Sequence, residues 1–274
     1  MRSRRAVRAL SELCLTSGAL VVLFVVYLLY WTGVRADSAM DGEIGRLRDQ
    51  WARHGGSAAV APPTVPDAPP GEPRPDAAPP APAPVPAPAD GTGVTAPAVP
   101  GATASPAPPA SPAPRTGGTA APAAPPRAGA AFAVMYVPRF GTDWAKPVLE
   151  GTGLDTLKRG LGHYEGSAPL GGTGNFAVAG HRRTHGDPFK DLPRLRPGDA
   201  VLLTDGTTWF TYRVDTRPYR TAPTDTRVLD PVPAAAGYAA PGRYLTLTTC
   251  DPEWGHSHRL VVWAHLETTA PAAP

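Results

Sequence analysis

The sequence predicts a mainly all-β domain, a small barrel or sandwich, preceded by a single transmembrane helix and a proline-rich tether. Three observations predict this: a charge-free apolar segment near the N-terminus, a long Pro/Ala/Gly tract, and short alternating segments beyond that tract. Of the 37 prolines, 23 fall between residues 61 and 130, where no Cys, Trp, Tyr or Phe occurs. That tract cannot build a core, so residues 132–267, about 136 in number, form one domain of ordinary size.

Residues 13–34 carry no charge over 22 positions, which is enough for a helix to cross a hydrocarbon core of roughly 30 Å. Four arginines lie among residues 1–12, so the positive-inside rule places this end in the cytoplasm and everything after Val34 outside. A cleaved signal peptide is the alternative, but its apolar core is usually only about 7 to 15 residues long. We therefore expect an uncleaved, single-pass anchor in the cell membrane.

Residues 35–55 follow the span and place Met40, Ile44, Leu47 and Trp51 at spacings of three and four. This pattern indicates a short amphipathic helix just outside the membrane, and a solvated stalk is an equal alternative. Residues 56–131 hold too little apolar side chain to offset chain entropy, so we expect a disordered, extended linker. Such a tether lets a domain work well away from its membrane anchor.

The charge of the chain excludes nucleic acid as a partner. The net charge is +3, but the arginines of residues 1–12 are a local source of positive charge. Residues 132–267 contain 15 Lys and Arg against 14 Asp and Glu. A nearly neutral domain has no basic surface that follows phosphates.

Five short apolar or alternating runs within 132–267 predict strands, because Gly, Pro and Asp separate them. Asp205-Gly206 lies between two of these runs and predicts a tight hairpin turn. Short helices are expected only at 153–160 and 188–195, and a flexible tail at 268–274. Many short strands with little helix are typical of a small barrel or sandwich. The five runs are 175–181, 200–204, 208–214, 244–250 and 259–266.

Cys250 is the one cysteine of the exported part, because Cys14 lies within the predicted span. A lone exported thiol is unusual, since exported cysteines are normally paired as disulfides. Single cysteines are most often buried and inert. Cys250, however, ends a predicted strand and is followed by the polar turn 251–253. This position favours an accessible, functional thiol.

Two further side chains lie at strand ends and complement a thiol. Arg259 opens the next predicted strand, and if the two strands are neighbours it lies at the same end of the sheet as Cys250. An arginine is always protonated and stabilises a thiolate or an oxyanion. His181 ends another strand and titrates near neutral pH, as a general acid to a leaving amine must. Acyl transfer through a thioester needs this set of groups.

The order AGHR at 179–182, TLTTC at 246–250 and Arg259, after a transmembrane anchor, resembles the sortases, the membrane-held cysteine transpeptidases of Gram-positive bacteria. The resemblance implies an eight-stranded sortase β-barrel at 132–267. It makes Cys250 the nucleophile, His181 the general acid/base and Arg259 the oxyanion ligand. It also implies cleavage of a C-terminal sorting signal between Thr and Gly, and transfer of the acyl group to an amine of a peptidoglycan precursor. No cofactor is implied, and we expect a monomer.

Other segments resemble the class E sortases of high-GC actinobacteria, which would favour LAxTG over LPxTG as the sorting motif. By this resemblance Tyr164, His163 and Thr249 are candidate substrate-binding residues, with ordinary loop packing as the alternative for Tyr164 and His163. No lid motif of the pilus-building class precedes the core, which argues against pilin polymerisation. The segments are VPR at 137–139, GHY at 162–164, GNFAVAGHR at 174–182, DPF at 187–189 and LRPGD at 195–199.

The histidines suggest a zinc site, and two other functions are alternatives to the sortase. His185 follows His181 at i+4, but Gly180 and Gly186 bracket the pair and no third ligand stands at a characteristic spacing, so we expect no zinc. Another cysteine-dependent cell-wall transpeptidase is one alternative function. A non-catalytic cell-envelope binding module is the other, and it is favoured if Cys250 is buried and unreactive. The remaining histidines of the zinc hypothesis are His163, His256, His258 and His265.

Overall fold

The computed structural model describes residues 2–56, 62–63 and 126–272. The predicted linker at 56–131 therefore lies mostly outside the described residues. One long helix, α1 (Arg2–Arg53), precedes the linker, and a β-rich domain follows it. The side chains of residues 2–11, 26 and 28–34 of α1 also lie outside the description.

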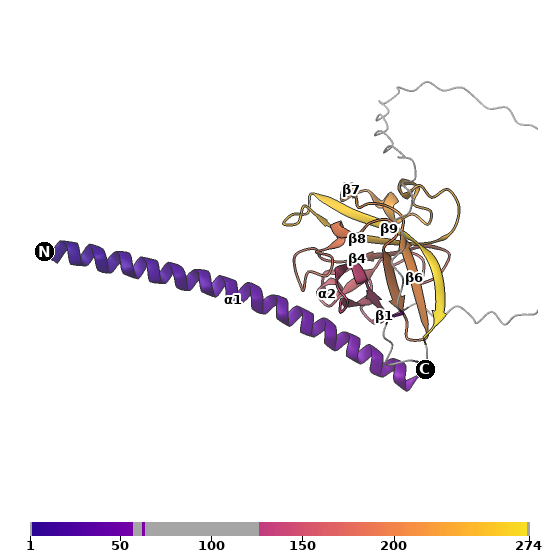
Figure 1. The fold of residues 1–274 in the computed structure, drawn as a ribbon, viewed down its shortest axis with the longest axis horizontal. Helices are drawn as coiled ribbons and strands as arrows, with labels where there is room; N and C mark the ends of the chain where they lie inside the picture. Colours follow the sequence, from indigo (N-terminus) through magenta and orange to yellow (C-terminus); the bar gives the residue numbers. More distant parts are fainter. Residues whose placement is uncertain (1, 57–61, 64–125, 273–274) are drawn as a thin grey trace, which may run out of the picture. The chain divides into compact units, whose positions relative to one another are not determined.

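The β-rich domain is a closed barrel, as predicted (Figure 1). Within the described ranges the sheet has nine strands in the order β6-β5-β1-β2-β3-β4-β8-β9-β7, and β6 also pairs with β9. That last pairing closes eight strands into a barrel and leaves β7 as an addition beside β9. The strands are β1 (Ala131–Tyr136), β2 (Ala145–Glu150), β3 (Leu161–His163), β4 (Gly174–Ala179), β5 (Ala200–Thr204), β6 (Thr208–Val214), β7 (Tyr219–Thr221), β8 (Arg243–Asp251) and β9 (His258–Pro271).

All five predicted strands are present, as β4, β5, β6, β8 and β9, and the β5–β6 hairpin turns at Asp205-Gly206. The other four strands were not predicted. β2 contains a proline, Pro147, and β3 and β7 are only three residues long. Short or interrupted strands show little alternation, so their neighbours in the sheet decide their structure.

The helix predicted at 153–160 is present as the shorter α2 (Leu154–Leu157). The helix predicted at 188–195 was wrong, because that segment contains only the 3₁₀ turn η2 (Leu192–Arg194). Pro193 lies inside it and has no N–H to donate, which prevents a regular α-helix. The other 3₁₀ turns are η1 (Pro138–Phe140), η3 (Thr226–Leu229) and η4 (Ala234–Ala236).

The flexible tail predicted at 268–274 was wrong for its first four residues. β9 continues to Pro271, and its end pairs with β6 from Thr211↔Thr268 to Thr208↔Pro271. β-branched threonines suit this exposed end of a strand. Residues 273 and 274 lie outside the description.

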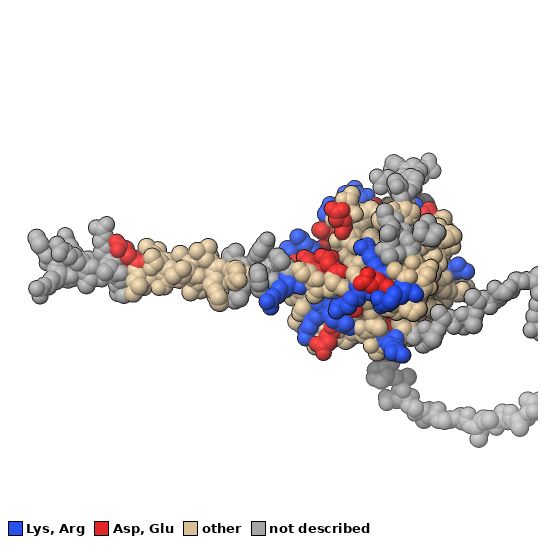
Figure 2. Space-filling view, turned by 90° about the horizontal axis from the view of Figure 1, so that it is seen from below, with Lys and Arg blue, Asp and Glu red and all other residues tan. Residues whose placement is uncertain are grey.

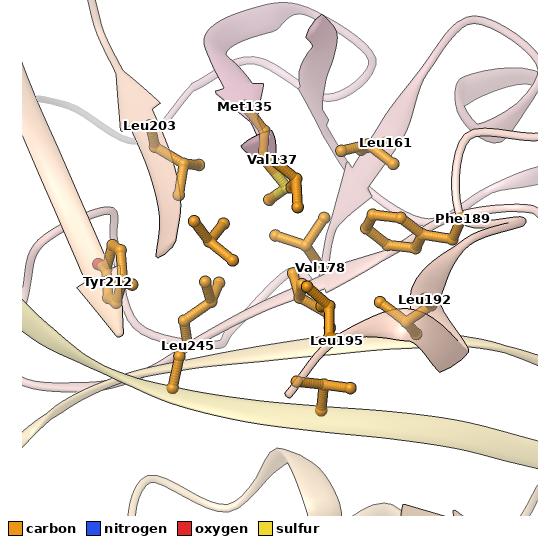
Figure 3. Close-up of a cluster of buried hydrophobic side chains, with 14 of the residues drawn as sticks. Met135, Val137, Leu161, Val178, Phe189, Leu192, Leu195, Leu203, Tyr212 and Leu245 are labelled. Carbon is orange, nitrogen blue, oxygen red and sulfur yellow. The ribbon is translucent and has the colours of Figure 1, made fainter. Parts of the chain in front are cut away.

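The barrel interior holds the main hydrophobic core (Figure 3). Leu245 and Leu247 enter it from β8, and Leu260, Val262 and Ala264 enter it from β9. Every second residue of β8 and β9 thus faces the core, and the alternate residues face outwards.

The C-terminal part of α1 packs on the outside of the barrel. Met40, Ile44 and Leu47 are 0%, 5% and 4% exposed. Ile44 and Leu47 join a second cluster with β1, β5 and β6 residues such as Tyr136 and Trp209. Burial of each such side chain is worth about 1.5–3 kcal/mol. Neither the membrane-surface helix nor the solvated stalk is therefore correct, because the predicted apolar face is buried on the protein itself.

The sequence also made two predictions about the chain as a whole, one about its surface charge and one about its membrane span. On the face seen in Figure 2, basic and acidic side chains are interspersed over the barrel, in agreement with its small net charge. Among the residues that the structure describes, no helix is both long and apolar enough to cross a membrane. The span at 13–34 includes side chains outside the description and stays a prediction.

Leu247→Ala should destabilise the barrel by about 2–5 kcal/mol, because it removes a core side chain that is 1% exposed and leaves a cavity. Urea unfolding followed by tryptophan fluorescence measures this change. Leu154→Ala is the matched control, since Leu154 is 74% exposed and should change stability by less than about 0.5 kcal/mol. Equal effects of the two substitutions would contradict the assigned core.

Candidate active site

Cys250 and Arg259 are directly opposite each other on neighbouring strands. β8 and β9 are antiparallel, and their register pairs Cys250 with Arg259. Side chains of directly opposite residues lie on the same face with Cβ atoms about 4.5–5.5 Å apart. The prediction that both lie at the same end of the sheet is therefore confirmed. Both residues are partly exposed.

His181 follows the parallel strand β4, which pairs with the edge of β8 opposite to β9. The β4–β8 register pairs Ala179 with Thr248, and the Gly180 N–H donates to the Thr248 carbonyl over 3.1 Å. The Thr249 hydroxyl donates to the Gly180 carbonyl over 2.8 Å. These bonds hold His181, the residue that follows Gly180, level with Cys250 along the strands. In the sheet order β4-β8-β9, the thiol strand thus lies between the histidine and the arginine strands.

The outer face of β8 becomes progressively less covered towards Cys250. Thr246 is fully buried, with its hydroxyl donating to the Asn175 side-chain oxygen over 2.7 Å. Thr248 comes next on the same face, and its hydroxyl lies 3.1 Å from the Tyr164 hydroxyl. Cys250 follows and is partly exposed. The thiol is therefore neither in the core nor fully in solvent, which is the setting that a reactive cysteine needs.

Arg259 is held by the backbone of the β8–β9 loop. Its Nη1 donates to the carbonyls of His256 (3.3 Å) and His258 (3.1 Å). It has no carboxylate partner among the residues described. A cation anchored in this way, without a carboxylate, can stabilise negative charge that develops beside Cys250.

An ion-pair cluster missed by the sequence analysis joins the residues that follow the histidine and the cysteine. Arg182 Nη1 donates to the Cys250 carbonyl over 3.3 Å and also to the Asp251 carboxylate. The other Asp251 oxygen lies 2.6 Å from Arg220 Nε on β7. The Arg182 and Asp251 side chains are only 11% and 16% exposed. The one sequence signal was that a charged residue directly follows both His181 and Cys250.

His181 lies in a setting that favours its neutral form. Its ring stacks on His185 with 4.9 Å between centroids. Its Nε2 is buried and has no hydrogen-bond partner among the described residues. Burial, and then the charge of His185, lower the pKa of His181 below its ordinary value. A neutral imidazole with an unengaged nitrogen can accept a proton from a thiol.

The His181–His185 stack depends on an unusual turn. His185, Gly186 and Asp187 all have left-handed backbone angles, with φ of 54°, 79° and 48°. Holding a residue other than glycine there costs on the order of 1 kcal/mol or more. Arg183 connects this turn to the β8–β9 loop. It pairs with Glu253 of that loop and lies 4.8 Å over the Trp254 ring. Within the described part of the chain no cluster of three or more His, Cys, Asp or Glu is arranged to hold a metal.

The three candidate substrate-binding residues lie at different depths. Tyr164 is partly exposed and borders the outer face of β8 through its contact with Thr248. Thr249 is 2% exposed, and its side chain is turned towards Gly180. This hydrogen bond holds Gly180, the residue before His181. Tyr164 alone of the three borders the face that carries Cys250.

His163 lies beneath this surface. It is 6% exposed, with Nδ1 2.8 Å from the Glu150 carboxylate and Nε2 2.8 Å from the Ser167 hydroxyl. Its ring also stacks on Phe176 at 4.7 Å. Both ring nitrogens are thus engaged inside the protein. Any role of His163 towards a ligand is indirect, through the segment that carries Tyr164.

His185→Asn should raise the pKa of His181, because it removes a like charge while asparagine tolerates the left-handed backbone. The pKa should remain below the ordinary value of about 6.5, since burial is the larger cause and persists. NMR titration of the histidine ring protons measures the shift. His54→Asn, on α1, is the control and should leave the His181 titration unchanged. A His181 titration that does not move in His185→Asn would contradict the assigned coupling.

Comparison with known proteins agrees with this geometry. The family model of the sortase domain matches residues 135–267. Sortase SrtE1 of Streptomyces coelicolor is 30% identical over 273 residues, which cover 97% of this chain, and the chain spans 58% of the length of that relative.

Solved structures give the same result. Sortase E of Streptomyces avermitilis is 67% identical with a TM-score of 0.50, over 53% of this chain and 92% of that one. Sortase E1 of Streptomyces coelicolor, solved with a tripeptide in its active site, is 37% identical with a TM-score of 0.50, over 52% of this chain and 91% of that one. The chain therefore belongs to the sortase family of cysteine transpeptidases.

Proposed function

We propose that this protein is a membrane-anchored, extracytoplasmic sortase of class E type. It cleaves a C-terminal LAxTG-like or LPxTG-like sorting signal between Thr and Gly and transfers the acyl group to an amine of the peptidoglycan precursor. The observation that carries this proposal is the pairing of Cys250 with Arg259 across β8 and β9, with His181 at the end of the neighbouring strand β4. The 67% identity with a sortase E supports the class.

The proposed reaction is a two-step acyl transfer. His181 takes the proton of Cys250, and the thiolate attacks the threonine carbonyl carbon while Arg259 stabilises the oxyanion. The intermediate collapses to a thioester as the bond to glycine breaks, and protonated His181 gives its proton to the leaving amine. The acceptor amine then attacks the thioester, His181 takes the amine proton, and the thiolate of Cys250 leaves.

Tyr164 is proposed to contact the sorting signal directly. It is the candidate that borders the outer face of β8, and its hydroxyl lies 3.1 Å from Thr248, two residues before Cys250. His163 and Thr249 are proposed to act by positioning, His163 through the Tyr164 segment and Thr249 through Gly180. No cofactor enters this reaction.

The proposed localisation rests on α1. Its described residues from Leu13 to Val25 include apolar side chains that are 46–73% exposed. A helix whose surface consists of exposed Leu, Val and Phe side chains is unfavourable in water and suits a lipid environment. With arginines before the span, the barrel lies outside the cytoplasm, where sorting signals and peptidoglycan precursors meet.

The direct test incubates the full chain in detergent with matched LAETG and LPETG peptides and an oligoglycine or diaminopimelate-type amine. Mass spectrometry should show cleavage between Thr and Gly, an acyl adduct on Cys250 and the transfer product. Preference for LAETG would agree with class E. A folded chain that neither cleaves nor forms an adduct, and whose thiol resists alkylation, would favour the binding-module alternative.

Cys250→Ala and His181→Ala should each reduce transfer by on the order of 10³-fold or more, because each removes a group that reacts. Arg259→Ala should reduce it by about 10²–10³-fold, as expected for loss of an oxyanion ligand. Rates of peptide cleavage and far-UV circular dichroism separate lost activity from lost fold. His256→Ala, an exposed histidine in the same loop, is the control and should retain activity. Full activity of Cys250→Ala would end the proposal.

Arg182→Met should lower kcat by roughly 10-fold to 100-fold with little change in KM, because a small displacement of His181 relative to Cys250 impairs proton transfer more than binding. Asp251→Asn breaks the same pair and also the contact with Arg220, so the combined loss in the double variant should be smaller than the product of the two single losses. Arg194→Met, with a side chain 58% exposed on η2, is the matched control. Additive losses in the double variant would show that the two residues act separately.

A further inference from the structure

The segment 36–51 of α1 contacts the barrel along its whole length. Its apolar contacts come from Met40, Ile44 and Leu47, which are at most 5% exposed. Two ion pairs flank them, Asp37 with Lys146 at 2.8 Å and Glu43 with Arg159 at 3.7 Å. Arg48 also donates to the Tyr136 hydroxyl over 3.1 Å. The contact therefore combines buried apolar side chains with polar bonds to β1, β2 and the segment after α2.

This docked segment has a defined direction along the barrel. Near its start, a Cβ on Gly186 would lie 2.9 Å from an Asp37 carboxylate oxygen and 3.2 Å from the Met40 methyl carbon. Gly186 belongs to the turn that stacks His185 on His181. Near its end, the Trp51 ring lies against the β5–β6 turn and leaves no room for a Cβ on Gly206. Fourteen residues of helix separate Asp37 from Trp51, which is about 21 Å.

The start of the docked segment is also the end nearest the predicted span. Asp37 follows Val34, the last residue of that span, by three residues, or about 4.5 Å along a helix axis. The turn that carries His185 and Gly186 is thus within one or two helical turns of the membrane boundary. The β5–β6 turn lies at the far end of the segment.

We propose that residues 36–51 form a docking helix that holds the His181 and Cys250 end of the barrel at the bilayer surface. This inference rests on the membrane span of the proposed function. It replaces the expectation that the domain works at a distance on an extended tether.

The connection between the helix and the barrel agrees with this arrangement. At the helix end, the Gly56 N–H donates to the Trp51 carbonyl over 2.8 Å. At the start of the barrel, the Gly129 N–H donates to the Glu150 carbonyl over 2.8 Å. Residues 57–125 therefore join two points of one folded unit. Their length does not set the distance between the barrel and the membrane.

The test measures the height of two points above the membrane. The full chain with Cys14→Ser and Cys250→Ala receives a single labelling site, either Thr184→Cys in the His185 turn or Thr207→Cys in the β5–β6 turn. Both threonines are exposed. Each protein is labelled with a fluorophore and reconstituted into phosphatidylglycerol and phosphatidylethanolamine vesicles that contain a headgroup-linked energy acceptor. The label at 184 should lie closer to the lipid than the label at 207 by about 20 Å, the length of the docked helix.

Two matched double variants test the cause of this difference. Ile44→Glu with Leu47→Glu places two charges in the buried face and should abolish the difference in height. Gln50→Glu with Ala52→Glu adds the same charge at exposed positions of the helix and should preserve it. If the first pair prevents folding, the comparison of positions 184 and 207 in the otherwise unaltered chain still decides the proposal.

Equal heights, or a label at 207 nearer the lipid, would overturn the proposal. A chain that does not float with the vesicles would overturn it as well, because the span would then be absent. Since the labelled chains lack Cys250, these results are independent of peptide cleavage. The cleavage assay in detergent reports on the proposed reaction separately.

Discussion

The register of β8 between its two neighbours is the constraint on which the rest of the site depends. Side chains alternate along β8, so a slip of one residue would turn Cys250 into the core and expose Leu247. Leu245 and Leu247 fix the register from inside the barrel. The Thr249 hydroxyl donates to the Gly180 carbonyl and so fixes the register of β8 against the segment that follows β4. His181 and Arg259 take their positions relative to the thiol from this one strand.

The two groups beside the thiol have contrasting electrostatic settings. Arg259 is a permanent cation held by backbone carbonyls, so it suits negative charge that forms nearby. His181 is partly buried and stacked on another histidine, so its pKa is lowered and its neutral form is favoured. The arginine is therefore suited to hold charge, whereas the histidine is suited to move protons. The Arg182–Asp251 pair ties the segment that carries His181 to β8, the strand of Cys250.

The sequence predicted what local pattern controls. β4, β5, β6, β8 and β9 alternate clearly, and Cys250, His181 and Arg259 were found because each stands at a strand end beside polar turns. The interruption of β2 at Pro147 and the shortness of β3 and β7 removed any such signal. Contacts between distant segments also could not be predicted from the sequence, because they depend on how loops approach one another. The Arg182–Asp251 pair, the His185 stack and the barrel contact of Met40 are of this kind.

β9 pairs with β8, β7 and β6, and the same strand carries Arg259 near its start. The β6 pairing closes the barrel and the β8 pairing brings the guanidinium to the thiol, so both depend on the placement of β9. Without β9 in the sheet the barrel stays open and the thiol lacks its cation. The candidate site is therefore complete only when the last strand of the chain has taken its place in the sheet.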